Sequence, residues 1–392
     1  MATPLFIKDT FGMEADPVGI LTQNYPVYTP NATYTPQITA GTGKFSGQGL
    51  SVNRAPSATF AVGMQREFAS TGRITNTVTA GAGANAEKSL FQWSGWVQLN
   101  TVATTLAATP LISLASSAQG TGNRIPLFGV LNNTTAGLNL VFPTNYSSFT
   151  TGPVLVAVQT GLYYFVSVRV SGAVASNTLQ TTVVVSGATI RDNLATTYSA
   201  AQFNAGSIVN RWQTENSTSV TYTLDDVTMQ QVDGTSPLWP AGFTDGVANL
   251  PVQGANDMPL MPPVRSWLRP LDSNGSVNQW VPSAAIPNYQ AAASSTEFVQ
   301  ATDSGQVDLY KFDPTTTPAL TGIKAVQITE TSAKFLSVNP QLKYEAADAT
   351  TTNFDVVSKG TQRIIAVKEQ GASDTEFTPA TLATLEVGNI SL

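Results

Sequence analysis

The carboxylates are the first candidates for chemistry in this chain, and they are sparse. Residues 93–232 contain four of them: Asp192, Glu215, Asp225 and Asp226. A glycosidase needs two carboxylates on either side of a cleft, and these four form no clustered motif. The adjacent pair at 225 and 226 could offer two oxygen ligands to calcium. Neighbouring side chains of a regular strand point to opposite faces, however, so both could reach one ion only at a β-bulge. We therefore predict a structural Asp near a strand end and no metal site.

Other catalytic chemistry is restricted by what the composition leaves out. The chain has no His and no Cys, which excludes Ser-His and Cys-His pairs and the ordinary zinc, iron–sulfur and thiol centres. Its Gly-x-Gly pairs never gain the third glycine of a dinucleotide loop, and no phosphate-binding Gly-Lys-Ser/Thr sequence occurs. We expect a non-enzymatic protein that needs no cofactor and no metal.

Aromatic residues offer a different chemistry, the stacking of sugar rings. Trp93, Tyr163, Tyr164 and Trp212 are the candidates for such a glycan-binding platform. In alternating strands about half of the aromatic residues face the core, and Trp96 is expected to be one of those. A glycan-binding sandwich and a purely structural sandwich both remain open.

The elements that would position these residues are β-strands. Residues 40–232 alternate apolar and polar positions in short runs separated by Gly, Asn and Ser turns, which is typical of an all-β sandwich. Residues 101–200 carry only four charged side chains: Arg124, Arg169, Arg191 and Asp192. Uncharged strand edges tend to pair with neighbours unless something covers them. A protein packed within an assembly would cover them.

Composition divides the rest of the chain into three segments. Residues 1–39, with scattered prolines and aromatics, are expected to be an extended docking arm or a loop packed on its own domain. Residues 233–290 combine many prolines with Trp239, Trp267 and Trp280, which favours an ordered strap pressed against a surface. The arm and the strap are predicted to order against neighbouring copies or partner proteins, and to be protease-sensitive in the isolated chain.

Residues 291–392 are predicted to form a second, smaller β-rich domain with one short helix. Thr378 and Pro379 match the N-cap and first helical position, Leu382 and Leu385 would face the core, and Gly388 would end the helix.

Charge and hydropathy exclude two classes of partner. The formal net charge is −6 and no Lys/Arg cluster occurs, so we expect no nucleic acid. No apolar run approaches the roughly 18 residues of a spanning helix, so no membrane partner is expected.

Three stretches of the first domain carry a family resemblance: Phe91–Leu99, Gly161–Val170 and Leu224–Met229. In this order they resemble the early, central and closing strands of the concanavalin A-like jelly roll of the laminin-G type. Tyr163 and Tyr164 stand in place of that family's usual aromatic-His pair. The resemblance implies a jelly-roll sandwich over 40–232.

The second domain carries a closer resemblance. Glu297–Thr302, Gly305–Phe312, Gly322–Ile328 and Leu385–Gly388 follow in an order similar to a C-terminal module of structural proteins from the tail regions of tailed bacteriophages. Ser337–Lys343 and Thr378–Pro379 stand where that family carries an Arg/Gly stretch and a Trp-Thr pair, so this copy has diverged.

The two resemblances imply a structural protein of a tailed-phage particle, assembled in the host cytoplasm. The tail, baseplate or fibre-attachment region is the first expectation. A capsid decoration or head-fibre protein and a receptor-recognition module that binds glycan are the alternatives. Its partners would be other virion proteins, further copies of itself and, in the last alternative, bacterial surface glycan.

Overall fold

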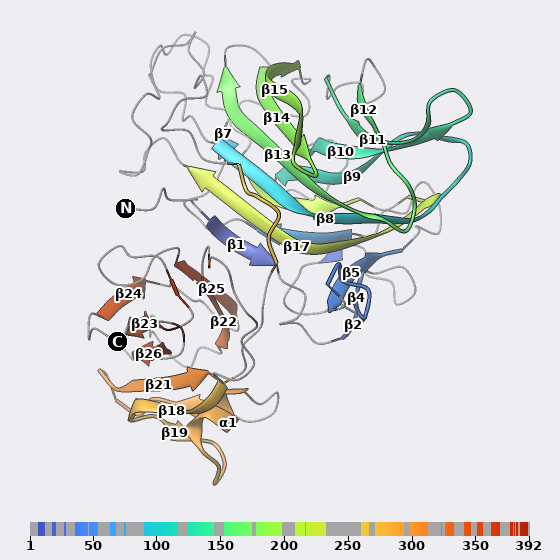
Figure 1. Cartoon of the computed structure of the whole chain (residues 1–392). Helices are drawn as coiled ribbons and strands as arrows, with labels where there is room; N and C mark the ends of the chain where they lie inside the picture. The colour runs from blue at the N-terminus through green and yellow to red at the C-terminus, as the bar shows by residue number, and fades with distance from the viewer. Residues whose placement is uncertain are drawn as a thin grey trace. The chain divides into compact units, whose positions relative to one another are not determined.

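The computed structural model of the chain contains two compact units, Thr10–Ser266 and a smaller one made of Met1–Asp9 and Trp267–Leu392 (Figure 1). The structure describes residues 7–11, 18–20, 27–28, 36–45, 47–53, 63–67, 74–75, 90–116, 124–144, 153–174, 178–197, 208–215, 217–232, 260–265, 271–293, 298–303, 305–312, 323, 326–332, 341–345, 351–355, 362–368, 377–378, 380, 382 and 385–390.

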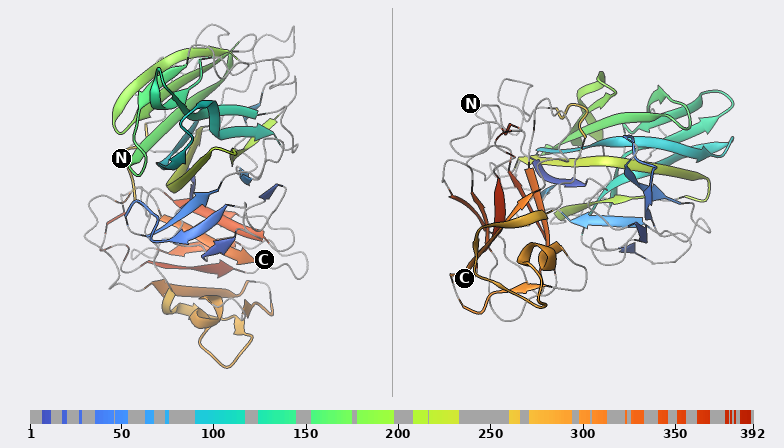
Figure 2. Two further views of the ribbon diagram at one scale, coloured as in Figure 1. Left: turned by 90° about the vertical axis from the view of Figure 1, so that its right-hand side faces the viewer. Right: turned by 60° about the horizontal axis from the view of Figure 1, so that its bottom comes forward.

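The larger unit is a sandwich of two antiparallel sheets (Figure 1; Figure 2). The nine-stranded sheet runs in the order β15 (Ala188–Thr197), β14 (Thr178–Val185), β13 (Tyr163–Val174), β8 (Leu90–Val102), β17 (Val220–Val232), β5 (Gln48–Val52), β4 (Gln37–Ala40), β2 (Gly19–Ile20), and β1 (Ile7–Phe11) pairs with β17. The eight-stranded sheet runs β12 (Val154–Ala157), β11 (Gly137–Phe142), β10 (Arg124–Asn133), β9 (Leu106–Ser116), β16 (Ile208–Thr214), β6 (Gly63–Glu67), β3 (Val27–Tyr28), and β7 (Ile74–Thr75) pairs with β16. The predicted all-β sandwich is confirmed.

Strand β8 shows how the sequence specifies this packing. Phe91, Trp93 and Leu99, at odd-numbered positions, point into the core between the sheets. Gln92 and Trp96, at even-numbered positions, lie on the opposite side of the same strand, because successive side chains alternate. We call that side of the nine-stranded sheet its outer face.

The centre of the core is an aromatic cluster that joins the two sheets. The ring of Trp93 lies 5.2 Å from that of Phe128 and 6.2 Å from that of Trp212, centre to centre. All three side chains are fully buried. A buried ring cannot stack on a sugar, so the prediction that Trp93 and Trp212 form part of a glycan platform is wrong.

Parts of the predicted arm pair within the sandwich itself. Strand β2 pairs with β4, and β3 pairs with β6. Of the two expectations for residues 1–39, this matches a segment packed on its own domain.

The predicted strap over 233–290 does not form one element. Residues 260–265 pack on the sandwich, whereas β18 (Leu271–Asn278) is already a strand of the smaller unit. Trp280 lies in that unit and donates its indole N–H to the carbonyl of Gln306 (3.1 Å). Trp239 and Trp267 lie outside the described residues. The boundary at 290 is therefore corrected to 266/267, and ordering against partner proteins stays a prediction.

The smaller unit is built around a five-stranded sheet, as the β-rich expectation required. Its order is β18, β21 (Val307–Phe312), β26 (Glu386–Ile390), β23 (Gln341–Glu345), β24 (Thr351–Asp355). Two further pairs accompany it, β19 (Val281–Pro282) with β20 (Val299–Gln300) and β22 (Val326–Ser332) with β25 (Gln362–Lys368), together with the short helix α1 (Asn288–Ala293).

The predicted helix near the end of the chain is partly correct. The amide of Leu382 donates to the carbonyl of Thr378 (2.9 Å), and Leu382 and Leu385 are buried as expected. Gly388 does not end this turn; it lies inside β26. Neither this turn nor α1, the helical parts of the described chain, is long and apolar enough to cross a membrane.

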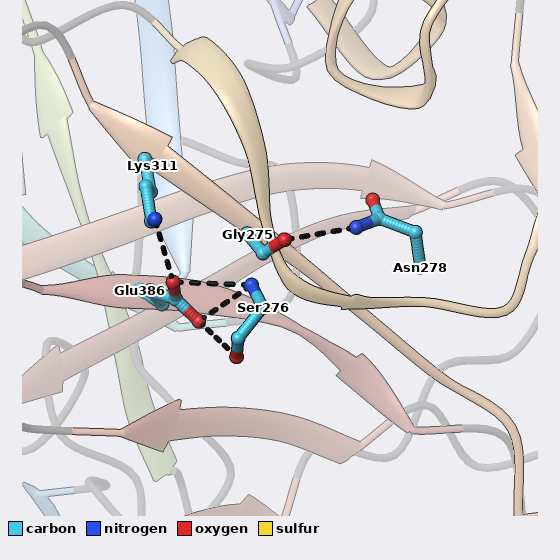
Figure 3. A network of polar contacts seen from close by, with 5 residues as sticks. All are labelled: Gly275, Ser276, Asn278, Lys311 and Glu386. Carbon is cyan, nitrogen blue, oxygen red and sulfur yellow. Dashed lines mark hydrogen bonds and ion pairs between the residues drawn. The ribbon is translucent and has the colours of Figure 1, made fainter.

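One polar contact ties β18 to β26 in the smaller unit (Figure 3). Both carboxylate oxygens of Glu386 accept the amide of Ser276 (3.1 and 3.0 Å), and Oε2 also accepts its hydroxyl (2.6 Å). Lys311 Nζ lies 3.4 Å from Oε1. Burial alone would raise the pKa of Glu386, but the hydrogen bonds from Ser276 and the charge of Lys311 outweigh it and lower that pKa below 4.5.

This contact predicts an acid-sensitive smaller unit. Because the folded pKa of Glu386 lies below the unfolded value, its contribution is complete above that value and is lost as pH falls through the folded pKa. Ser276→Ala should lower the free energy of unfolding by about 1–2 kcal/mol near neutral pH, and by less in acid. Urea unfolding at about pH 7 and pH 3 measures this difference. An equal loss at both values would mean that the hydroxyl acts independently of the carboxylate's charge.

Candidate functional site

Charged side chains, aromatic rings and a residue with an unusual backbone conformation lie together at one place in the larger unit. Five segments supply them: the turn after β4, β8, the start of β13, β17 and the strap segment 260–265. We call this group the Trp96 cluster, and it consists of Thr42, Lys44, Phe45, Trp96, Tyr163, Asp225, Asp226 and Arg265.

A β-bulge in β17 creates the base of the cluster. Asp225 pairs with Trp96, yet Thr228 pairs with Ser94, so β17 carries one extra residue at this point. Asp226 has a φ of 47°, a left-handed conformation that is unusual for a residue other than glycine. Both aspartates are 1% exposed. The bulge that the sequence argument required for both side chains to come together is therefore present.

The carboxylate of Asp225 anchors the turn after β4. Its Oδ2 accepts the amide of Lys44 (2.6 Å), and its Oδ1 accepts the amide of Asp226 (2.9 Å). Only glycine fits at position 43, because an added Cβ would lie 2.9 Å from Oδ2 of Asp225 and 2.6 Å from the carbonyl oxygen of Gln48. The turn thus lies directly on the buried carboxylate.

Burial dominates the electrostatics of the cluster. It raises the pKa of Asp225 to about 6, although the amides of Lys44 and Asp226 and the charge of Arg265 act in the opposite direction. Burial, followed by the charges of the two aspartates, raises the pKa of Tyr163 well above 10. Tyr163 therefore stays protonated, and its hydroxyl donates to the carbonyl of Thr42.

Two cations lie over the aromatic rings. Lys44 Nζ lies 5.2 Å from the ring centre of Trp96 and 6.0 Å from that of Tyr163. The guanidinium carbon of Arg265 lies 4.9 Å from the ring centre of Phe45, which meets Trp96 edge-on at 5.9 Å. Each distance is within reach of a cation–π contact. The contact between Arg265 and Phe45 links the strap segment to the turn.

The strap segment 260–265 lies on the outer face of the nine-stranded sheet. Trp96 donates its indole N–H to the carbonyl of Val264 (3.0 Å), and Ser167 donates its hydroxyl to that of Met261 (3.5 Å). Met261 is buried. Although this face is buried, it is largely polar; its members include Gln92, Ser94, Ser167, Arg169, Thr223, Thr228 and Gln230.

Of the four predicted platform residues, only Tyr163 enters this cluster. Tyr164 packs against the core, and its hydroxyl accepts the amide of Gln159 (3.0 Å). Trp93 and Trp212 lie in the core. Trp96, which we expected in the core, is instead half-buried on the outer face.

The sequence held a signal for Trp96 but none for its cationic partners. Its even-numbered position, opposite in parity to Phe91 and Trp93, places it outside the core. Lys44 and Arg265 are far from it in the sequence, so spacing could not reveal them.

The aspartate pair offers little to a metal ion. Among the described residues, no group of three or more carboxylates gathers at one place. Both oxygens of Asp225 already accept backbone amides. The residues present do not form a recognisable calcium site.

No protein-family model matches this chain, and no curated protein matches its sequence. Solved structures with a similar fold include a cellulose-induced protein, which is 11% identical with a TM-score of 0.35 over 56% of this chain and 96% of its own. A carbohydrate esterase from the Shiga toxin-encoding bacteriophage phi24B is 12% identical, with a TM-score of 0.36 over 59% of this chain and 98% of its own. A seed lectin of Lotus tetragonolobus is 6% identical, with a TM-score of 0.35 over 56% and 97%. Each likeness spans little more than half of this chain.

Proposed function

We propose that this chain is a non-enzymatic structural component of a tailed-bacteriophage particle, in the tail, baseplate or fibre-attachment region. The phage assignment is supported by the resemblance of residues 290–392 to the tail-protein module. Strands β20, β21 and β26 lie on the stretches that carry this resemblance. The low charge of the sandwich suits a protein packed among others.

One observation favours a structural role over a binding role: the chain covers its own polar sheet face. Open sugar sites need a concave surface with polar groups available to the ligand. Here Trp96 Nε1 and the hydroxyl of Ser167 already donate to carbonyls of the strap segment. The outer face therefore serves packing within the chain.

Glycan recognition is the second candidate function, because exposed cations lie beside aromatic rings at the edge of the Trp96 cluster. Lys44 and Arg265 are exposed there, beside the half-buried rings of Trp96 and Tyr163. Glycan arrays probed with the wild type and with Lys44→Ala test it: the structural role predicts no binding by either protein. Binding that Lys44→Ala removes, at an unchanged melting temperature, would establish the second candidate.

Quantitative mass spectrometry of gradient-purified particles tests the structural proposal. A tail component should occur in copy numbers that follow tail symmetry, whereas a capsid decoration protein should follow the copy number of the major capsid protein. A copy number that follows the major capsid protein would assign this chain to the head instead of the tail. Absence from the particles would remove the proposal altogether.

A further inference from the structure

Two segments that are far apart in the sequence meet above the buried carboxylate of Asp225. The turn after β4 contacts the carboxylate directly, through the amide of Lys44 (2.6 Å). The strap segment 260–265 reaches the same turn through Arg265 and Phe45 (4.9 Å), and the sheet through Val264 and Trp96 (3.0 Å). Lifting the turn would therefore admit water to the carboxylate and loosen one end of the strap segment.

We propose that the turn and the strap segment form a latch whose closure takes up one proton at Asp225, so that acid holds it shut and neutral pH loosens it. A regulatory device of this kind goes beyond the proposed structural role and does not depend on it.

The groups that face Asp225 decide the sign of this effect. Arg265 brings positive charge from the strap segment, Lys44 brings its backbone amide from the turn, and Asp226 brings a second carboxylate from β17. Tyr163 of β13 is protonated and carries no charge at these pH values. Of the strands that pair with β17, β8 and β5 contain no titratable side chain, whereas β1 contains Lys8 and Asp9. The charge of Arg265 and the two backbone amides are not enough to cancel the effect of burial.

The linkage follows from the difference between the closed and open forms. With the latch closed, the pKa of Asp225 is about 6, whereas in water the ordinary value is 3.8. The closed form therefore holds the proton more tightly, and closure is favoured as pH falls through 6. From a pH below 3.8 to a pH above 6, the ratio of closed to open forms changes roughly a hundredfold. Between about pH 5 and pH 7.5 it changes about tenfold.

Hydrogen exchange tests the latch on the intact chain. The amide of Lys44 is the most direct probe, because its acceptor is the carboxylate itself. Protection factors for the amides of Gly43 and Lys44, corrected for the intrinsic effect of pH, should fall about tenfold from about pH 5 to pH 7.5. Protection that is constant, or that rises with pH, would overturn the proposal.

Two pairs of variants make the test specific. Asp225→Asn should abolish the pH response, whereas Glu215→Gln, which alters a buried carboxylate outside the latch, should keep it. A response that survives in Asp225→Asn would overturn the proposal. If that variant does not fold, Arg265→Gln serves instead: loss of this charge should move the midpoint above 6, whereas Arg265→Lys should leave it near the wild-type value. An unmoved midpoint in Arg265→Gln would also contradict the latch.

Discussion

Replacing Gly388 with alanine is expected to unfold the smaller unit or to destabilise it by more than about 4 kcal/mol. An added Cβ would lie 1.7 Å from the carbonyl oxygen of Asp308 and 2.9 Å from the Cα of Leu309. Strand β26 lies inside the sheet, where Gly388 pairs with Leu309 on one side and with Lys343 on the other. Because both neighbours are backbone held in a ladder, neither can move away without breaking hydrogen bonds.

Urea unfolding followed on the smaller unit measures this effect, with Gly305→Ala as the matched control. Gly305 has a φ of 79° but open space around its Cα, so alanine there meets backbone strain without a clash. We expect that control to cost about 1 kcal/mol. If Gly388→Ala were no more harmful than Gly305→Ala, the close approach of β26 to β21 would be wrong.

Trp93→Ala is expected to destabilise the larger unit by about 3–5 kcal/mol. The side chain is fully buried and contacts Phe128 and Trp212 of the opposite sheet, so its removal leaves a cavity at the point where the sheets meet. Thermal unfolding of the sandwich measures the loss.

Trp96→Ala is the control for this second prediction. Its ring is half-buried on the outer face, and it loses one hydrogen bond to Val264 and its ring contacts, so the cost should be clearly smaller. Equal losses for the two variants would contradict the placement of Trp93 and Trp96 on opposite sides of β8. An unchanged melting temperature in Trp93→Ala would contradict the burial of that side chain between the two sheets.

Local patterns predicted the strands well, because a strand with an apolar core side and a polar outer side leaves a period of two in the sequence. The odd-numbered positions of β8 follow this rule. Residue type alone groups Trp93 with the platform aromatics, whereas its odd-numbered position along β8 indicates the core. Applied strictly, the same rule would have separated Trp93 from Trp96.

Contacts between distant segments were beyond local patterns. The N-cap at Thr378 and the buried Leu382 could be read from a few neighbouring residues, and the helical turn is there. Gly388 matched a helix end equally well, but its role depends on Asp308, which a local pattern does not include. Likewise, the proline-rich composition of 233–290 did not reveal that β18 pairs with β21.

The Trp96 cluster is the extreme case of this limit. Asp225 meets Lys44 across 181 positions of sequence, and Trp96 meets Val264 across 168. The sequence places the adjacent aspartates near the end of a regular strand, whereas they lie at a bulge in the middle of β17. No local sequence pattern could predict that the turn and the strap segment cover these aspartates, because both segments are distant in the sequence.

Immunogold electron microscopy of gradient-purified particles, with antibodies raised against this chain, tests the assignment to a phage tail most directly. We expect gold on the tail or its distal end, at a constant position from particle to particle. Particles of a related phage that lacks this chain should stay unlabelled under the same conditions. Absence of gold from intact and from partly disrupted particles alike would contradict a virion role, and gold confined to the head would contradict the tail.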